Sequence, residues 1–207
     1  HGAGDDHDQH SAGTPQSRNP LVRFQRGFET RFEAIRTRYG GLLEPRPDVL
    51  LLSDYVKGTL TDAVVAFALA SEIPVVANAK PASLPRYRDA ELVSLNRPET
   101  EGALGRAVSV ESAVRDAADV VARTGCRHAL VTLSGDGMAT DGFFVPPVPV
   151  EVFDAAGAGD TTIATVALGL ATAGFRPEVF ELAARLSAAV VRKVGVAVPS
   201  VDDLASI

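Results

Sequence analysis

The sequence predicts an α/β domain in which helices flank a mainly parallel sheet. Short apolar runs of strand length recur along the chain, and helical patterns lie between them. The run at residues 48–53 is continuous, as expected for a strand that is buried on both faces. Alternating strands and helices favour a parallel sheet, and such sheets bind ligands beyond the carboxyl ends of their strands.

The N-terminal residues 1–20 contain no aliphatic side chain larger than alanine, so we expect a disordered polar tail. The alternative for the three histidines of this segment is adventitious metal binding. The composition then changes, and residues 21–207 are predicted to form one domain. Aromatic residues at helical spacing predict that this domain opens with an amphipathic helix from Phe24 to about Gly40.

The remaining elements are predicted from local signals. Expected strands cover residues 48–53, 74–78, 91–95 and 128–133. Thr59 and Asp62 form a predicted capping box for a helix that runs to about residue 71. Ser109 caps a second helix, which reaches about residue 124. Gly174 and Pro177 separate the last two long helices as a C-cap and a first-turn residue, and the last helix is expected to end near residue 194.

Composition excludes several classes of protein. A chain of 207 residues has room for one domain with a sizeable core. Its net charge of -6 and the lack of a basic run argue against a nucleic-acid partner. Cys126 is the single cysteine, so no disulfide forms within the chain and a reducing compartment fits. Without an apolar run of membrane-spanning length or a signal-type core, a cytoplasmic protein with no membrane partner is expected.

Polar residues fall just after the predicted strands, so they would meet at one edge of the sheet. They are Asp54, Lys57, Asn78, Lys80, Asn96, Glu99, Ser134 and Asp136. Lys57 and Lys80 are two of only three lysines in the chain, and with Asn78 they are the candidates for binding a substrate. For either lysine alone, a solvated loop residue is the alternative.

The segment 154–160, Asp-Ala-Ala-Gly-Ala-Gly-Asp, runs directly into an alanine-rich helical pattern. Glycines at the start of a helix leave backbone N–H groups bare, and the helix dipole adds positive charge there, which predicts a site for phosphate oxygens. Asp160 would repel a resting phosphate, so we assign it the role of a general base that takes a proton from an attacking hydroxyl. The alternative is a glycine-rich N-cap in which Asp160 only complements the dipole.

Two other glycine-rich phosphate motifs are excluded. The dinucleotide fingerprint needs a third glycine, and Thr162 stands in its place. The Walker pattern needs a Gly-Lys-Ser or Gly-Lys-Thr sequence, which occurs nowhere in the chain.

The pattern from Asp154 to Asp160 resembles the second signature of the ribokinase-like (PfkB) carbohydrate kinases. This resemblance extends over residues 21–207 and implies a ribokinase-like fold, with ATP as the donor and Asp160 as the catalytic base. It also implies an anion hole for the transferred phosphoryl group. The amides of that anion hole belong to Gly157, Ala158 and Gly159.

Two further segments resemble donor-site elements of the same family. Asn96 and Glu99 match its Asn-x-x-Glu element, which helps to hold Mg²⁺; because this ion keeps several waters, one or two protein oxygens suffice. By itself, the pair could equally be a helix N-cap with a nearby carboxylate. Segment 132–137 resembles the loop over the donor phosphates, and its alternative is an ordinary hairpin turn. The resemblance assigns to the nucleotide Asn96, Glu99, Thr132, Ser134, Gly135, Gly137 and Asp154.

Segments 53–58 and 85–88 resemble one branch of the family, the D-glycero-D-manno-heptose 7-phosphate kinases. Three positions depart from what is usual there. Asn78 replaces an Asp, Ala156 a Thr, and Ala184 an Asn near the nucleotide. Family members also carry an N-terminal part with most of the sugar-binding groups. The resemblance therefore implies an N-terminally shortened chain whose acceptor site is incomplete.

We therefore expect an ATP- and Mg²⁺-dependent kinase for a small sugar phosphate, above all a heptose 7-phosphate. A homo-oligomer or a complementary subunit is expected to complete the acceptor site. Two alternatives stay open. One is a catalytically incomplete nucleotide-binding or scaffolding relative, and the other is a PfkB kinase for another sugar or a nucleoside.

Overall fold

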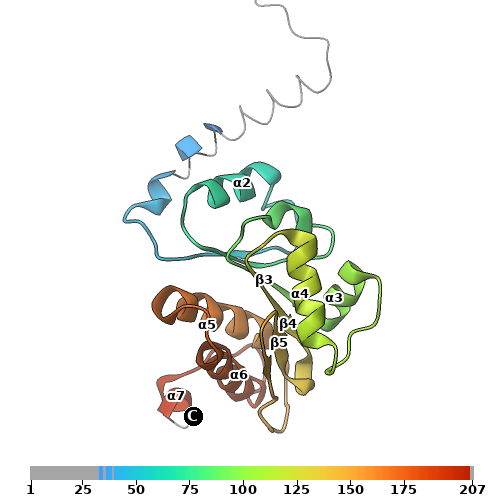
Figure 1. Cartoon of the computed structure of the whole chain (residues 1–207). Coiled ribbons are helices and arrows are strands. Elements are labelled where there is room, and N and C mark those ends of the chain that lie inside the picture. The colour runs from blue at the N-terminus through green and yellow to red at the C-terminus, as the bar shows by residue number, and fades with distance from the viewer. Residues whose placement is uncertain (1–32, 35, 39, 206–207) are drawn as a thin grey trace, which may run out of the picture.

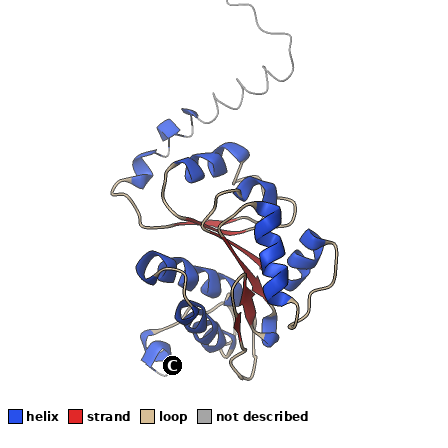
Figure 2. Ribbon diagram, viewed as in Figure 1, coloured by secondary structure: helices blue, strands red, loops and turns tan. Residues whose placement is uncertain are grey.

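Helices lie on both faces of a six-stranded sheet in the computed structural model of the chain (Figures 1 and 2). The structure describes residues 33–34, 36–38 and 40–205. The polar tail predicted at 1–20 and most of the predicted amphipathic helix lie outside the described residues.

The sheet is mainly parallel, as predicted. Its strands, in spatial and chain order, are β1 (Leu50–Ser53), β2 (Val75–Asn78), β3 (Leu92–Asn96), β4 (His128–Thr132), β5 (Met138–Thr140) and β6 (Phe144–Val145). The first four strands pair in parallel, and β5 and β6 are added antiparallel at one edge. Because β1 to β4 run in the same direction, their carboxyl ends lie together at one end of the sheet.

Two helices cover one face of the sheet and the remaining long helices cover the other. The helices are α2 (Asp62–Ala70), α3 (Arg97–Leu104), α4 (Ala113–Thr124), α5 (Ala158–Ala173), α6 (Pro177–Val191) and α7 (Val201–Ala205). Short 3₁₀ turns occur at Gly40–Leu43, Leu84–Tyr87 and Ser134–Asp136. Figure 1 shows α5 and α6 on the side of the sheet opposite α4. Among the described residues, no helix has the length and apolar character that a bilayer crossing requires.

Successive residues of β3 enter two different hydrophobic cores. Val93 and Leu95 pack with α4 residues on one face, whereas Leu92 packs with residues of α5 and α6 on the other. Such a strand is apolar at every position because it is buried on both faces. For residues 48–53 this expectation was wrong, because β1 is an edge strand and Leu51 is 40% exposed.

Two predicted helix caps are wrong by a few residues. The N-cap of α2 is Thr61, whose hydroxyl accepts a hydrogen bond from the Val64 amide (3.4 Å), so Thr59 is not the cap. Ser112 precedes α4, while Ser109 bonds to Ser112 within the turn before the helix. Both segments offer hydroxyl groups at neighbouring positions, and the local pattern does not decide which one terminates the helix.

The two helices on the α5 side approach closely at Gly169. A Cβ atom built at this position would lie 2.3 Å from Cγ1 of Val179, which is too close for any side chain. Val179 is buried and β-branched, so it has little freedom to turn away. Glycine is therefore required at residue 169 by the α5–α6 contact.

Gly169→Ala should lower the free energy of unfolding by about 1–3 kcal/mol, because overpacking outweighs the gain in helix propensity. The matched control is Gly102→Ala in α3, where a Cβ would meet Pro81 Cγ at an ordinary 3.4 Å. That change should raise stability by about 0.5–1 kcal/mol. Urea unfolding of both variants provides the comparison, and equal stabilisation by the two changes would contradict the packing assigned to Gly169.

Candidate active site

The N-terminus of α5 opens at the edge of the sheet where β1 to β4 end. Gly157 is the N-cap with φ 85°, and a Cβ there would lie 3.2 Å from the Ala197 carbonyl oxygen, so glycine meets both constraints. The Thr161 amide donates to the Gly157 carbonyl (2.9 Å) and the Ala158 amide to Ala155 (3.3 Å). Among the described residues, no carbonyl accepts from the Gly159 or Asp160 amides. Bare amides at a helix N-terminus, together with the helix dipole, are the arrangement that favours an anion.

Asp154 holds the loop that leads into this helix. One carboxylate oxygen accepts from the Ala156 amide (2.9 Å) and the other from the Gly195 amide (3.2 Å). The Phe153 amide donates to the Val191 carbonyl (2.8 Å), which adds a second link to the end of α6. Asp154 lines neither pocket described below, so the structure supports a positioning role and shows no direct contact surface for a nucleotide.

Two pockets meet in front of α5. An apolar pocket of about 460 Å³ lies between the β4–β5 hairpin, segment 147–152 and α6. A polar pocket of about 270 Å³ lies over the ends of β1 to β4. Three residues line both pockets: Asn96, Thr132 and Gly159. Asp160 lines the polar pocket and Ala158 the apolar one, so the first turn of α5 stands at their junction.

The polar pocket contains a chain of charged groups. The Lys80 ammonium donates to one oxygen of the Glu99 carboxylate. The other Glu99 oxygen accepts from the backbone amide of Asn96 (2.9 Å). In return, the side-chain oxygen of Asn96 accepts from the backbone amide of Glu99 (2.9 Å). This reciprocal capping box begins α3, so the N-cap alternative for Asn96 and Glu99 holds, and both residues line the pocket as well.

The donor set fits a water-rich Mg²⁺ site. Glu99 uses one lone pair on each carboxylate oxygen for the contacts above and keeps others, and the Asn96 amide oxygen does the same. Asp160 adds a third oxygen-bearing side chain to the same pocket. In the part of the chain that the structure describes, no three His, Cys, Asp or Glu residues are grouped so that they could hold a metal ion by themselves. Phosphate and water would supply the remaining ligands, as is usual for Mg²⁺.

The segment 132–137 is the hairpin between β4 and β5, and it also lines the apolar pocket. The Leu133 amide donates to the Gly137 carbonyl (2.8 Å), which closes the turn. Ser134 has φ 57°, a left-handed conformation that favours glycine. At Gly137 (φ 99°) a Cβ would lie 2.4 Å from the Val145 carbonyl oxygen. Ser134, Gly135 and Gly137 all line the pocket. The hairpin turn is therefore confirmed, and the role of this loop over the donor phosphates stays a prediction.

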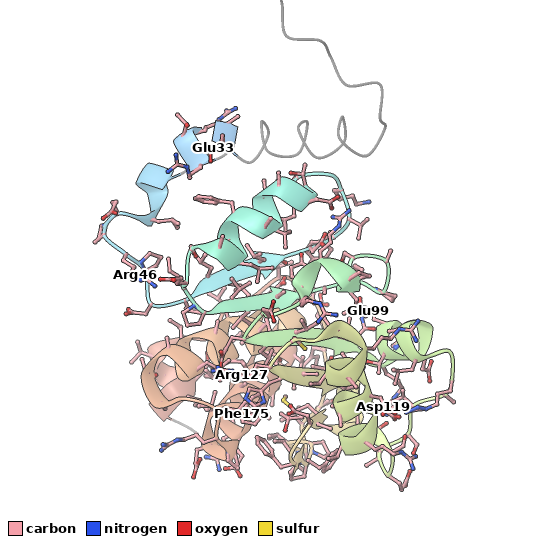
Figure 3. All side chains as sticks on the ribbon, turned by 45° about the horizontal axis from the view of Figure 1, so that its top comes forward. Glu33, Arg46, Glu99, Asp119, Arg127 and Phe175 are labelled. Atoms are coloured by element: carbon pink, nitrogen blue, oxygen red, sulfur yellow. The ribbon has the colours of Figure 1, made fainter. Side chains whose placement is uncertain are left out.

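The structure brings together five of the eight polar residues predicted to meet at this edge. Those that line a pocket are Asn78, Lys80, Asn96, Glu99 and Ser134. Lys57 is exposed and lines neither pocket, although it was a predicted substrate residue. Asp136 pairs with Arg97 (2.6 Å), which ties the hairpin to α3. Glu99, at this end of the sheet, and Arg127, which precedes β4 at the opposite end, are labelled in Figure 3.

Asp54 is buried below the polar pocket. Its oxygens accept from the Val56 amide (2.9 Å) and the Tyr87 hydroxyl (2.8 Å). Burial opposes ionisation, but these hydrogen bonds, a further one from Ser83 and the nearby Arg86 charge together hold the pKa of Asp54 below its usual range. Burial and the contact with Asp54 raise the pKa of Tyr87, which stays neutral.

Sequence reasoning missed part of the lining. Tyr55 lines the polar pocket and its hydroxyl donates to Asp160 Oδ1 (3.3 Å). The signals for this position in the sequence are an aromatic residue two positions after a strand and its place in segment 53–58. In the apolar pocket, the missed residues are Pro147, Val148, Val150, Val152, Thr162, Ser187, Ala188 and Val191. Ala184, which the resemblance placed near the nucleotide, lines the same pocket.

Comparisons with known proteins agree with this architecture. The family model described as pfkB family carbohydrate kinase matches residues 46–203. The chain is 40% identical over 158 residues to the Bifunctional protein HldE of Pelobacter propionicus, which covers 72% of this chain and 32% of the relative. It is 39% identical over 186 residues to the protein of the same name from Paramagnetospirillum magneticum, covering 83% of this chain and 38% of the relative. The chain thus spans about a third of the length of these curated relatives.

Solved structures share the fold at low sequence identity. Phosphofructokinase-2 from Escherichia coli superimposes with a TM-score of 0.70 at 20% identity, covering 85% of this chain and 60% of that one. A ribokinase from Arabidopsis thaliana, solved with ribose and ATP, gives a TM-score of 0.63 at 20% identity over 77% of this chain and 55% of that one. The predicted ribokinase-like fold is confirmed.

Tyr87→Phe should lower the free energy of unfolding at pH 7 by about 1–3 kcal/mol, since a buried carboxylate loses a donor. The folded pKa of Asp54 is lowered, so its contribution is present above the unfolded pKa and is lost as pH falls through the folded pKa. The cost of the substitution should therefore shrink below about pH 4.

Urea unfolding of a double-mutant cycle with Asp54→Asn provides the measurement. The Tyr87→Phe change should cost less in the Asn background, because the charged partner is gone. An equal cost in both backgrounds would show that the Tyr87 hydroxyl does not act through Asp54.

Proposed function

The chain belongs to the pfkB family of carbohydrate kinases, and from this premise we propose that it transfers the γ-phosphoryl group of MgATP to a hydroxyl of a sugar phosphate. The observation that carries the proposal is the junction of the two pockets at the first turn of α5. A donor held in one pocket and an acceptor in the other would meet beside Gly159 and Asp160. Such alignment is the main requirement of phosphoryl transfer.

The apolar pocket supports the donor assignment. It is lined by small and aliphatic side chains of α6 and segment 147–152, which suit a flat nucleobase, and it ends at Gly159 and the hairpin. A nucleotide with its base against Ala184 and Ala188 would direct its phosphates toward the bare amides of α5. Those amides would stabilise charge on the transferred group as it moves.

Asp160 supports the chemistry at the junction. Its carboxylate lies in the first turn of α5 and faces the polar pocket, where an acceptor hydroxyl would approach. The proton of that hydroxyl passes to Asp160 while the oxygen bonds to the γ-phosphorus and the bond to the bridging oxygen breaks. Asn96 and Glu99 would hold Mg²⁺ through water, and the ion would neutralise negative charge on the phosphates.

The polar pocket supports an anionic acceptor. Lys80 is the cation among its lining residues, and Asn78 and Ser94 add neutral hydrogen-bonding groups. A phosphate on the acceptor could exchange with Glu99 for the Lys80 ammonium. The resemblance of segment 53–58 to the heptose 7-phosphate kinases supports that sugar as the acceptor. Because Lys80 is already paired, we propose that further acceptor contacts come from another segment or from a second subunit.

MgATP should bind to the chain without a sugar present, and Ala184→Phe should weaken that binding by about tenfold or more, since the larger side chain overfills the apolar pocket. Isothermal titration calorimetry measures both affinities. The matched control is Leu182→Phe on the exposed side of α6, which should leave affinity unchanged. Undetectable heat and no thermal shift of the wild-type chain at millimolar nucleotide would refute the assignment of the apolar pocket to the nucleotide.

Asp160→Asn should reduce turnover by roughly 10²–10⁴-fold, the usual contribution of a general base. Nucleotide affinity should hold or improve, because a carboxylate near the phosphates loses its charge. The control is Asp62→Asn, another acidic residue in the first turn of a helix, which lies in α2 and lines neither pocket. A coupled assay of ADP release with a panel of sugar phosphates measures turnover. Parallel loss of ATP binding and turnover would mark Asp160 as a structural cap instead.

A further inference from the structure

Tyr55 joins two segments that are far apart in the chain. Its hydroxyl donates a hydrogen bond to Asp160 Oδ1 at 3.3 Å, and its ring centroid lies 5.2 Å from the Lys80 ammonium. Through these contacts the loop after β1 reaches across the polar pocket to the first turn of α5. The Tyr55 side chain therefore lies against the proposed base.

The neighbouring backbone aims Tyr55 into the pocket. Asp54 is 3% exposed and is fixed by the Tyr87 hydroxyl below and by the Val56 amide on the other side. Val56 has φ 55°, so the chain turns sharply immediately after Tyr55. Tyr55 is 52% exposed, which leaves its side chain room to turn away from Asp160. Its backbone is held while its side chain can move.

The hydroxyl of Tyr55 and an acceptor hydroxyl compete for the carboxylate of Asp160, because both approach it from the polar pocket. A general base must accept a hydrogen bond from the group that it deprotonates, and Oδ1 of Asp160 already accepts from the phenol. An acceptor that approaches Oδ1 from the polar pocket must therefore displace the phenol. A water molecule faces the same competition, but it lacks the other contacts by which a sugar phosphate could displace a side chain.

We propose that Tyr55 guards the base: its hydroxyl holds Asp160 until an acceptor displaces it, and this contact suppresses the hydrolysis of ATP by water. The role rests on the proposed phosphoryl transfer. In the suppressed reaction, water oxygen bonds to the γ-phosphorus, the bond to the bridging oxygen breaks, and the water proton passes to Asp160. The products are ADP and phosphate, with the proton released to solvent.

Lys80 makes a second contact with Tyr55, through the aromatic ring. A cation over an aromatic face is attracted by the ring itself, so this contact does not require the hydroxyl. Phenylalanine at residue 55 would keep the ring over Lys80 and lose only the bond to Asp160. The Tyr55→Phe variant therefore isolates the contact that defines the guard.

The test measures ATP hydrolysis by the whole chain with MgATP and no sugar. Tyr55→Phe should raise the rate by roughly tenfold, the factor expected when a hydrogen bond to a charged group is removed. Thr59→Ala in the same loop is the control, because Thr59 is exposed and lines neither pocket; it should leave the rate unchanged. Asp160→Asn should cancel the increase when combined with Tyr55→Phe. A purely structural role for Tyr55 would lower the rate.

A Tyr55→Phe variant that keeps its affinity for MgATP, as measured by calorimetry, and yet hydrolyses ATP at an unchanged or lower rate would contradict the role proposed for Tyr55. That result would leave the donor site assignment intact. A chain that binds no MgATP would refute the proposed function, and the proposed role of Tyr55 would be refuted with it.

A second experiment needs no turnover. The chain has no tryptophan and three tyrosines, so its emission reports tyrosine directly. Asp160→Ala should brighten that emission by releasing the Tyr55 phenol from a quenching carboxylate, and the Tyr55→Phe background should abolish the change. Equal brightening in both backgrounds would contradict the contact.

Discussion

The placement of the first turn of α5 is the constraint on which the rest of the site depends. Asp154 bridges the amides of Ala156 and Gly195, and this clamp sets the loop that enters the helix. Gly157 then turns with a positive φ against the Ala197 carbonyl, so that the bare amides and Asp160 face the ends of the parallel strands. This clamp therefore places the proposed anion site and the proposed base at one junction.

Charge balance around that junction explains how several ionised groups coexist in a small pocket. Glu99 is neutralised by Lys80 and by the backbone at the start of α3. Asp160 accepts from a neutral phenol and lies at a helix N-terminus, where negative charge is stabilised. Each carboxylate thus has a partner that a substrate could replace. The lowered pKa of Asp54 belongs to a separate, buried cluster that supports the loop carrying Tyr55.

The sequence predicted the fold and much of the site because its signals are local. Buried parallel strands read as apolar runs, and a glycine-rich turn before an alanine-rich segment marks the start of α5. It could not show that β1 is an edge strand, because strand order arises from packing between distant segments. Lys57 and Lys80 look equivalent as loop lysines, yet among the described residues only Lys80 has a partner such as Glu99 to draw it into the pocket. Tyr55 was missed for the same reason, since its partner Asp160 lies 105 residues away.

The central claim is that phosphoryl transfer takes place where the two pockets meet. A crystal structure of the chain with Mg²⁺ and a non-hydrolysable β,γ-imido analogue of ATP tests it most directly. We expect the base between α6 and segment 147–152, and a γ-phosphate oxygen about 3 Å from the Gly159 amide nitrogen. Phosphates bound away from α5, with Asp160 facing no reacting atom, would contradict the account.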